Sequence, residues 1–334
     1  MLVAALGVWW IRRTLAAQGF DWHLAARSFA GLRWSWLAVS LVPIFATYYW
    51  RALRWAVMLK PIKAHPSVVN LLSATVIGFT AITLFGRAGE LIRPYLIARK
   101  EDVPLSSQLA TLLLERIFDL LMAILLFGFA LGRVNASGMS VGPTLASILA
   151  IGGKLLGLIG LILLILLLAF RHLAEPARRR LTDALRFLPE HQFQRAEKLV
   201  AAFVQGVGST RSDAALLLVL LYTVIEWVSI VACYWCVVRS FIGVSLTVID
   251  ILIFLGFIAF GAVIQLPGIG GGVQVASVLV LTELFRARLE TATAFAFIIW
   301  IITFVAIVPA GLLLALREGL QWNSLRQIGR EVSL

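Results

Sequence analysis

Long apolar runs separated by short polar segments extend from one end of the chain to the other. A helix needs about 20 apolar residues to cross a bilayer, and runs of that length occur at 34–59, 105–131, 143–170, 214–238 and 291–316. No stretch between them is long and polar enough to enclose a second core. The pattern predicts an all-α, polytopic membrane helix bundle that forms one domain over residues 1–334.

Two further apolar runs are interrupted by glycine. The run at 68–85 meets Gly-Arg-Ala-Gly-Glu before a short apolar segment at 91–98, and the run at 248–266 meets Pro-Gly-Ile-Gly-Gly-Gly before 273–285. Broken helices at matching places in two halves of a chain are typical of transporters with internal repeats. Glycine-rich backbone at membrane depth is tolerated where it lines a protein cavity. We therefore expect two re-entrant helical hairpins related by a weak inverted repeat.

Composition and charge support membrane insertion and give no reason to expect a nucleic-acid partner. Hydrophobic residues make up 61% of the chain and charged residues 14%, against about 25% charged in soluble domains. The formal net charge is +12, but most basic residues flank apolar runs, as they do in cytoplasmic loops. We expect an integral protein of a bacterial-type plasma (inner) membrane with both termini in the cytoplasm.

The longest hydrophilic stretch, at about 173–212, mixes basic and apolar residues. Arg178, Arg179 and Arg180 stand among interleaved leucines and phenylalanines. This pattern is typical of an amphipathic segment that lies against anionic lipid at the cytoplasmic surface. A solvated cytoplasmic loop is the alternative.

The sequence has no pattern that indicates a metal, a cofactor or a catalytic residue. Cys233 and Cys236 have C-x-x-C spacing, but they lie in a predicted span without a second pair or a nearby histidine. No Ser-His-Asp arrangement of a catalytic triad can be recognised in the sequence. The glycine-rich stretch after Pro267 lacks the Gly-Lys-Ser/Thr ending of a phosphate-binding loop. We expect no cofactor and no metal.

Charged residues inside apolar runs are the strongest functional signal, because a buried ion is costly unless it is paired or wetted. Glu115 and Asp119 share a helix face, and Arg116 can pair with Asp119. Two interpretations stay open: an internal salt bridge that locks helices together, or a site where Arg116 also meets a lipid phosphate. Glu226 is a further, isolated charge within a span.

More charges lie near the first glycine break and at the end of the run at 34–59. Arg87, Glu90 and Arg93 have three-residue spacing, so they share a face beside freed backbone N–H groups that suit an anion. Arg51 and Arg54 stand beside tryptophans, which favours interfacial anchoring. Arg54 can also reach a headgroup.

The second glycine break has the most unusual backbone. Proline and glycine free N–H and C=O groups there, and a helix that begins near Gly272 directs its positive end towards an anion. The residues that we expect to line a headgroup site in this segment are Gln265, Pro267, Gly268, Gly270, Gly271, Gly272 and Gln274.

Four motifs carry a resemblance to a known family. They are Arg-Ala-Leu-Arg-Trp at 51–55, Gly-Arg-Ala-Gly-Glu-Leu-Ile-Arg at 86–93, Glu-Arg-Ile-Phe-Asp at 115–119 and Pro-Gly-Ile-Gly-Gly at 267–271. Their order and spacing resemble the lysylphosphatidylglycerol synthase transmembrane family, a flippase-like domain, over nearly the whole chain. One departure is Gln274, because the family usually has a glutamate there. The departure weakens the case for a carboxylate-dependent step or a cationic headgroup.

The resemblance implies movement of a polar-headed lipid, such as a phospholipid or a polyprenyl-phosphate-linked lipid, between leaflets. Aminoacyl-transferring members carry a large soluble domain after the membrane part, and this sequence ends at Leu334, so we do not expect an enzyme. The expected partners are the lipid and either a lipid-synthesis enzyme or a second copy. Two alternatives remain: an intramembrane transferase with a lipid-phosphate donor, and a non-transporting scaffold for a lipid-synthesis enzyme.

Overall fold

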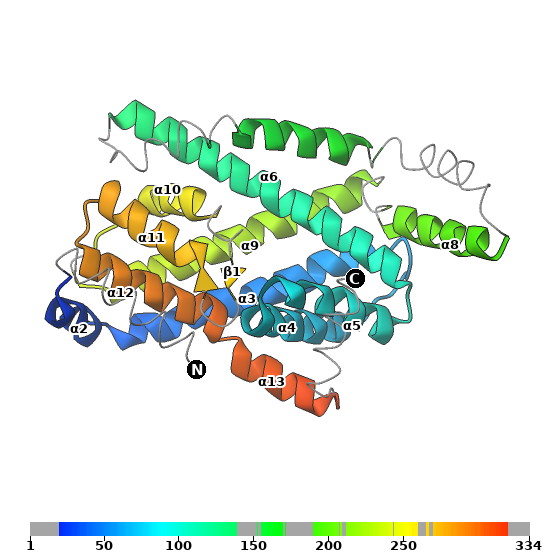
Figure 1. Cartoon of the computed structure of the whole chain (residues 1–334), viewed down its shortest axis with the longest axis horizontal. Helices are drawn as coiled ribbons and strands as arrows, with labels where there is room; N and C mark the ends of the chain where they lie inside the picture. The colour runs from blue at the N-terminus through cyan, green and yellow to red at the C-terminus, as the bar shows by residue number, and fades with distance from the viewer. Residues whose placement is uncertain are drawn as a thin grey trace.

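A computed structural model describes residues 20–138, 152, 155–169, 171, 190–206, 208, 212–242, 244–259, 265–266 and 270–319. Helices make up most of this part of the chain (Figure 1). Its elements are α2 (Trp22–Ala30), α3 (Trp34–Leu59), α4 (Val68–Phe85), η1 (Gly86–Leu91), α5 (Ile92–Glu101), α6 (Leu105–Ser137), α8 (Glu190–Gly206), α9 (Asp213–Ser240), α10 (Val248–Ile258), β1 (Gln265–Leu266), β2 (Gly270–Gly271), α11 (Gly272–Glu283), α12 (Leu289–Trp300), η4 (Ile301–Val305) and α13 (Val308–Arg317).

Within the described residues, four segments are long and apolar enough to cross a membrane: Val68–Phe85, Leu105–Ala136, Asp213–Ser240 and Leu289–Arg317. The bent pair of α2 and α3, with an angle of 76°, is a fifth candidate if it forms one span. Large apolar side chains such as Val42, Leu125 and Val228 are exposed on these helices. The chain is therefore an integral membrane protein, as the sequence predicts. Of the predicted run at 143–170, the helix Leu155–Ala169 lies in the described part.

α4, η1 and α5 form a hairpin. α4 ends at Phe85, and the next residue, Gly86, has a φ of 66°, a conformation that favours glycine. The chain then turns back so closely that a Cβ on Gly89 would lie 2.4 Å from the carbonyl group of Ala81. α5 returns beside α4, and a Cβ on Gly78 would lie 2.6 Å from the Cβ of Arg93. Glycines on both sides thus allow the returning chain to pack against α4.

α10 and α11 form a second pair, joined through a short ribbon. α10 ends at Ile258, earlier than the apolar run at 248–266 predicts. β1 and β2 are antiparallel and pair Gln265 with Gly271 and Leu266 with Gly270. The described part of the chain is otherwise helical, which confirms the all-α prediction, and this two-residue ribbon forms where glycine and proline interrupt the helix and the freed backbone groups need partners. β1 also contacts η1, so the two breaks lie next to each other.

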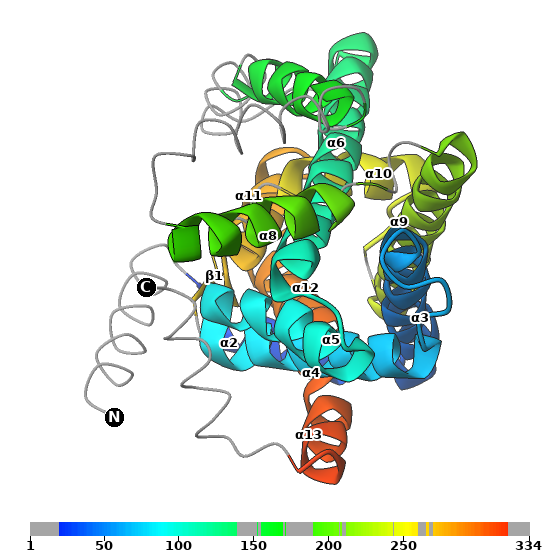
Figure 2. The same ribbon diagram turned by 90° about the vertical axis from the view of Figure 1, so that its right-hand side faces the viewer.

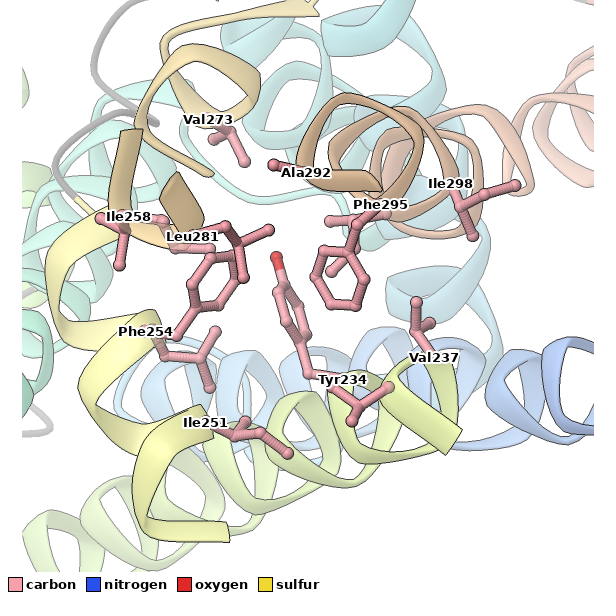
Figure 3. Packing of buried hydrophobic residues seen from close by; sticks show 14 of the residues in the cluster. Tyr234, Val237, Ile251, Phe254, Ile258, Val273, Leu281, Ala292, Phe295 and Ile298 are labelled. Carbon is pink, nitrogen blue, oxygen red and sulfur yellow. The ribbon is translucent and has the colours of Figure 1, made fainter. Parts of the chain in front are cut away.

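The largest apolar core lies among α9, α10, α11 and α12 (Figure 3). Tyr234, Phe254 and Phe295 pack at its centre, with ring centroids 5.9 Å apart both for Tyr234 and Phe254 and for Phe254 and Phe295. Gly256 brings α10 against α6, since a Cβ there would lie 2.6 Å from the carbonyl oxygen of Leu126. This core holds the second hairpin against the long helices. α3 and α9 run side by side (Figure 2).

The predicted run at 291–316 is one candidate span but not one α-helix. A π-helical segment, η4, and a turn separate α12 from α13, and such segments leave carbonyl groups without their usual helical donors. The hydroxyl of Thr83 donates to the carbonyl oxygen of Phe304 at 3.2 Å, and that of Tyr48 to Thr303 at 3.4 Å. Side chains of α3 and α4 thus satisfy the break. α13 packs against α4.

α6 runs along one side of the bundle (Figure 1). α8 packs near its start, where a Cβ on Gly206 would lie 2.4 Å from the carbonyl oxygen of Ser107. The helix Leu155–Ala169 packs near its middle, where Gly160 approaches Ile124. α8 belongs to the predicted amphipathic segment at 173–212, of which residues 173–189, 207 and 209–211 lie outside the described part.

A buried carboxylate ties the end of α5 to the start of α4. Glu101 accepts hydrogen bonds from Asn70 Nδ2 at 2.7 Å and from the Ser67 backbone N–H at 3.2 Å, and it pairs with Lys63 Nζ at 2.8 Å. Burial raises the pKa of Glu101, but these three donors outweigh it and hold the pKa below the usual value of 4.5. The stabilisation is therefore complete above pH 4.5 and is lost as the pH falls below it.

We expect Glu101→Gln to lower the free energy of unfolding by about 1–3 kcal/mol at neutral pH, because charged hydrogen bonds are lost. Denaturant titration in detergent micelles measures the difference, which should shrink as acid protonates Glu101 in the wild type. Asp102→Asn is the matched control, since Asp102 is exposed and Asn tolerates its φ of 53°. A difference that does not depend on pH would contradict this account of Glu101.

Candidate functional site

Four helices bring charged side chains together inside the bundle. We call seven of them the charge cluster: Arg51 and Arg54 of α3, Arg93 of α5, Glu115, Arg116 and Asp119 of α6, and Glu226 of α9. Most of these side chains are buried, and each lies within ion-pair distance of a group of opposite charge. Buried ions are stable only with such partners. The cluster therefore joins helices that are far apart in the sequence.

Arg54 lies at the centre of the charge cluster. Its Nη2 donates to Glu115 Oε1 at 2.6 Å, and its Nη1 donates to Asp119 Oδ1 at 2.8 Å and to Thr223 Oγ1 at 2.9 Å. Nη1 also lies 3.3 Å from Glu226 Oε2. The side chain has no exposed surface. Arg54 thus links α3 to α6 and α9 through protein groups.

Arg93 reaches the cluster from the returning arm of the first hairpin. Its guanidinium donates to both carboxylate oxygens of Glu115. The guanidinium carbon lies 4.2 Å from the ring centroid of Trp55, which is a cation–π contact. Gly78 leaves the space beside α4 that this position of α5 requires. The Arg93–Glu115 pair therefore holds the hairpin against α6.

Arg51 belongs to the charge cluster, and its interpretation as an interfacial anchor is wrong. Its Nη1 lies 3.5 Å from both Glu115 Oε1 and Asp119 Oδ2, and its Nη2 pairs with Glu226 Oε1. A spacing of three residues puts Arg51 and Arg54 on the same face of α3, and that face points inwards. Glu226, predicted as an isolated charge, is the partner that α9 supplies.

Arg116 marks the exposed edge of the cluster. Its side chain is 34% exposed, Arg51 and Asp119 are 14% exposed, and the other four are at most 3% exposed. The contacts of Arg116 are also long, at 3.7 Å to Asp119 and 3.9 Å to Glu115. The predicted trio of Glu115, Arg116 and Asp119 is therefore not self-contained, because Arg93 and Arg54 hold the two carboxylates more closely.

The charge cluster has a surplus of positive charge and contains donors that make no hydrogen bond. Four guanidinium groups face three carboxylates, which leaves a formal charge of +1. Buried donors without a hydrogen bond include Nε of Arg54 and Nε of Arg116. Positive charge and unused N–H groups both favour an anion, above all a phosphate. The arrangement can therefore hold an anionic group at its exposed edge.

The described residues of the second break form local backbone structure and are not part of the charge cluster. Gln265 and Gly270 contribute to the ribbon, and Gly272 begins α11. The backbone N–H of Gly271 donates to Gln274 Oε1 at 2.7 Å, which caps the start of α11. A role of these residues in headgroup binding stays a prediction.

Other predicted site residues do not enter the charge cluster in the described part. Glu90 lies in η1, and none of the ion pairs between described side chains involves it. The side chain of Arg87, like Pro267 and Gly268, lies outside the described residues. Among the residues that the structure describes, no group of three or more His, Cys, Asp or Glu side chains is placed to hold a metal ion.

These features define a polytopic integral membrane protein with a positively charged cluster inside its helix bundle. Residues 1–311 match the family described as the lysylphosphatidylglycerol synthase TM region, and the chain belongs to that family. No curated protein and no solved structure gives a significant match. The family match agrees with the resemblance that the four sequence motifs carry, and it associates the chain with lipids.

Proposed function

We propose that the chain moves a lipid with an anionic phosphate headgroup from one membrane leaflet to the other. The charge cluster carries this proposal, because it combines buried ions, a surplus positive charge and an exposed edge at Arg51, Arg116 and Asp119. Ions inside a membrane usually mark a pathway or a polar-ligand site. The surplus positive charge attracts a phosphate, and phospholipids and polyprenyl-phosphate-linked lipids both supply phosphate.

The two hairpins supply the walls of a route for the headgroup. The contacts of Glu101 with Ser67 and Asn70 support a first hairpin that returns to the side from which it starts. α10 and α11 have 11 and 12 residues, about 17 and 18 Å at 1.5 Å per residue, which is too short for a hydrocarbon core of about 30 Å. In our proposal both hairpins are re-entrant, related by an inverted repeat, and meet near the mid-membrane.

The chain acts as a carrier rather than an enzyme in this proposal. The carboxylates of the cluster face arginines, so none of them is an obvious free base for a transferase.

The proposed location is a bacterial-type inner membrane with both termini in the cytoplasm, and a second copy or a lipid-synthesis enzyme can deliver the lipid. Cysteine labelling tests the orientation: Lys60→Cys should react only from the cytoplasmic side, and labelling from outside intact cells would reverse it.

Reconstitution tests the proposed function. Purified protein in liposomes should accelerate the movement of fluorescent phosphatidylglycerol between leaflets, relative to protein-free liposomes. A fluorescent diacylglycerol of the same chain length, which has no phosphate, measures general disturbance of the bilayer and should move at its protein-free rate. Equal acceleration of both lipids would contradict a phosphate site. No acceleration of phosphatidylglycerol would favour the scaffold alternative.

A further inference from the structure

We infer that Glu226 and the phosphate of the ligand compete for Arg51, so that binding of the lipid makes Glu226 take up one proton. This inference rests on the proposed function and adds that lipid movement is coupled to protons. One proton accompanies each monoanionic headgroup. Its starting point is the difference between Glu226 and the other two carboxylates of the charge cluster.

Glu226 is the carboxylate of the cluster with the fewest partners. It meets Arg51 and Arg54, whereas Glu115 meets four arginines and Asp119 meets three among the described residues. Neither oxygen of Glu226 accepts a hydrogen bond of good geometry, although its side chain is only 1% exposed. Its ionised form therefore depends on two guanidinium groups alone.

The charged neighbours of Glu226 come from two helices that pack against α9. α3 supplies Arg51 and Arg54, and α6 supplies Asp119 and Arg116, which act on it through space. α10 and α12 also contact α9, but they meet its later part, where Tyr234 and other apolar side chains form the core (Figure 3). The protonation of Glu226 is thus governed by the arginines and by Asp119.

Arg51 is the partner that a ligand can take from Glu226. It is 14% exposed, whereas Arg54 has no exposed surface. A phosphate that binds the guanidinium of Arg51 displaces the carboxylate from it. Arg54 cannot replace Arg51, because its Nη1 already donates to Asp119 and Thr223. A buried carboxylate that keeps one ion contact of 3.3 Å and accepts no hydrogen bond is unfavourable, so Glu226 takes up a proton from the solvent and becomes neutral.

The exchange keeps the charge of the cluster constant. The empty cluster has a formal charge of +1 with Glu226 ionised. Binding adds one negative charge from a phosphodiester and one proton at Glu226, which leaves the charge unchanged. Movement of lipid and proton together carries no net charge across the membrane. In the pH range where Glu226 is ionised in the empty site and protonated in the loaded site, binding should weaken about tenfold for each unit by which the pH rises.

Calorimetric titration with dihexanoylphosphatidylglycerol, a water-soluble lipid with the phosphodiester headgroup, tests the inference on the full chain in detergent. Titration in two buffers of different ionisation enthalpy counts the protons that are taken up. Wild type should take up one proton per bound lipid. Glu226→Gln should bind the lipid with no proton uptake and with an affinity that does not change with pH. Asp102→Asn removes an exposed carboxylate outside the charge cluster and should keep the uptake of one proton.

The outcomes separate the inference from the proposed function. Binding to wild type without proton uptake, or unchanged uptake in Glu226→Gln, would overturn the inference and leave the proposed function standing. Glycerophosphoglycerol, the same headgroup without acyl chains, should bind far more weakly. If it binds as tightly as the lipid and with the same uptake, the proton exchange stands and the lipid is the wrong ligand. No binding of either compound to wild type would remove both proposals.

Discussion

Arg54→Ala should lower the free energy of unfolding by about 3–5 kcal/mol, the usual cost of removing one partner from a buried ion network. The variant takes from Asp119 its closest ion pair, at 2.8 Å, and leaves contacts of 3.5 and 3.7 Å. It also removes a fully buried side chain that links α3 to α6 and α9. Denaturant titration in detergent micelles measures the change.

The matched control for Arg54→Ala is Arg99→Ala. Arg99 is exposed on α5, and substitutions at exposed positions usually change stability by about 0.5 kcal/mol or less. Both variants remove one positive charge, so a general charge effect would appear in both. Equal stability of Arg54→Ala and wild type would mean that the charge cluster is not a buried ionic network.

Gly89→Ala should be nearly as destabilising, because it pushes the turn of the first hairpin away from α4. The added Cβ would lie 2.4 Å from the carbonyl carbon and oxygen of Ala81 and 2.5 Å from the backbone nitrogen of Ile82. Overpacking costs about 1–3 kcal/mol, and backbone atoms cannot rotate away as side chains do. We expect a loss of about 3 kcal/mol in the same titration.

Gly132→Ala is the control for the added methyl group. Gly132 lies within α6, and a Cβ there would meet nothing within 4 Å. Replacing glycine by alanine inside a helix stabilises it by up to about 1 kcal/mol. The two glycine variants should therefore differ in the sign of their effect. A stable Gly89→Ala would show that the hairpin turn does not pack against α4 as described.

The long helices could be predicted from the sequence because a helix that crosses the hydrocarbon core needs a run of about 20 apolar residues, which is easy to recognise. α3 begins and ends where the pattern indicates, at Trp34 and Leu59. The glycine breaks could also be predicted, since glycine and proline are unfavourable in a helix interior. Apolar composition does not show where an apolar run stops being helical, so the end of α10 at Ile258 and the ribbon after it were not predicted.

The break at η4 has a signal in the sequence other than apolar run length. Pro309 follows it and has no N–H to donate to the carbonyl group of Val305. The partners of the site were harder to predict, because contacts such as Arg51 with Glu226 join residues far apart in the chain. The spacing of Arg51 and Arg54 was the available clue, since both lie on one face of α3. Charges inside apolar runs did identify most of the cluster, because burial makes such charges costly.

The central claim is that the exposed edge of the charge cluster holds the phosphate of a moving lipid, and Arg116→Gln tests it most directly. Arg116 has long, partly exposed ion contacts, so its loss should change stability by about 1 kcal/mol or less. Loss of a charged hydrogen bond worth about 1.5–3 kcal/mol should slow lipid movement about 10- to 100-fold.

The measurement is the rate of fluorescent phosphatidylglycerol movement in proteoliposomes that contain equal amounts of wild type, Arg116→Gln or Arg99→Gln. Arg99 is exposed on α5 and outside the charge cluster, so its variant controls for the loss of one positive charge. The account predicts wild-type movement for Arg99→Gln and movement about 10- to 100-fold slower for Arg116→Gln. Movement at the wild-type rate in folded Arg116→Gln would contradict a phosphate site at the edge of the charge cluster.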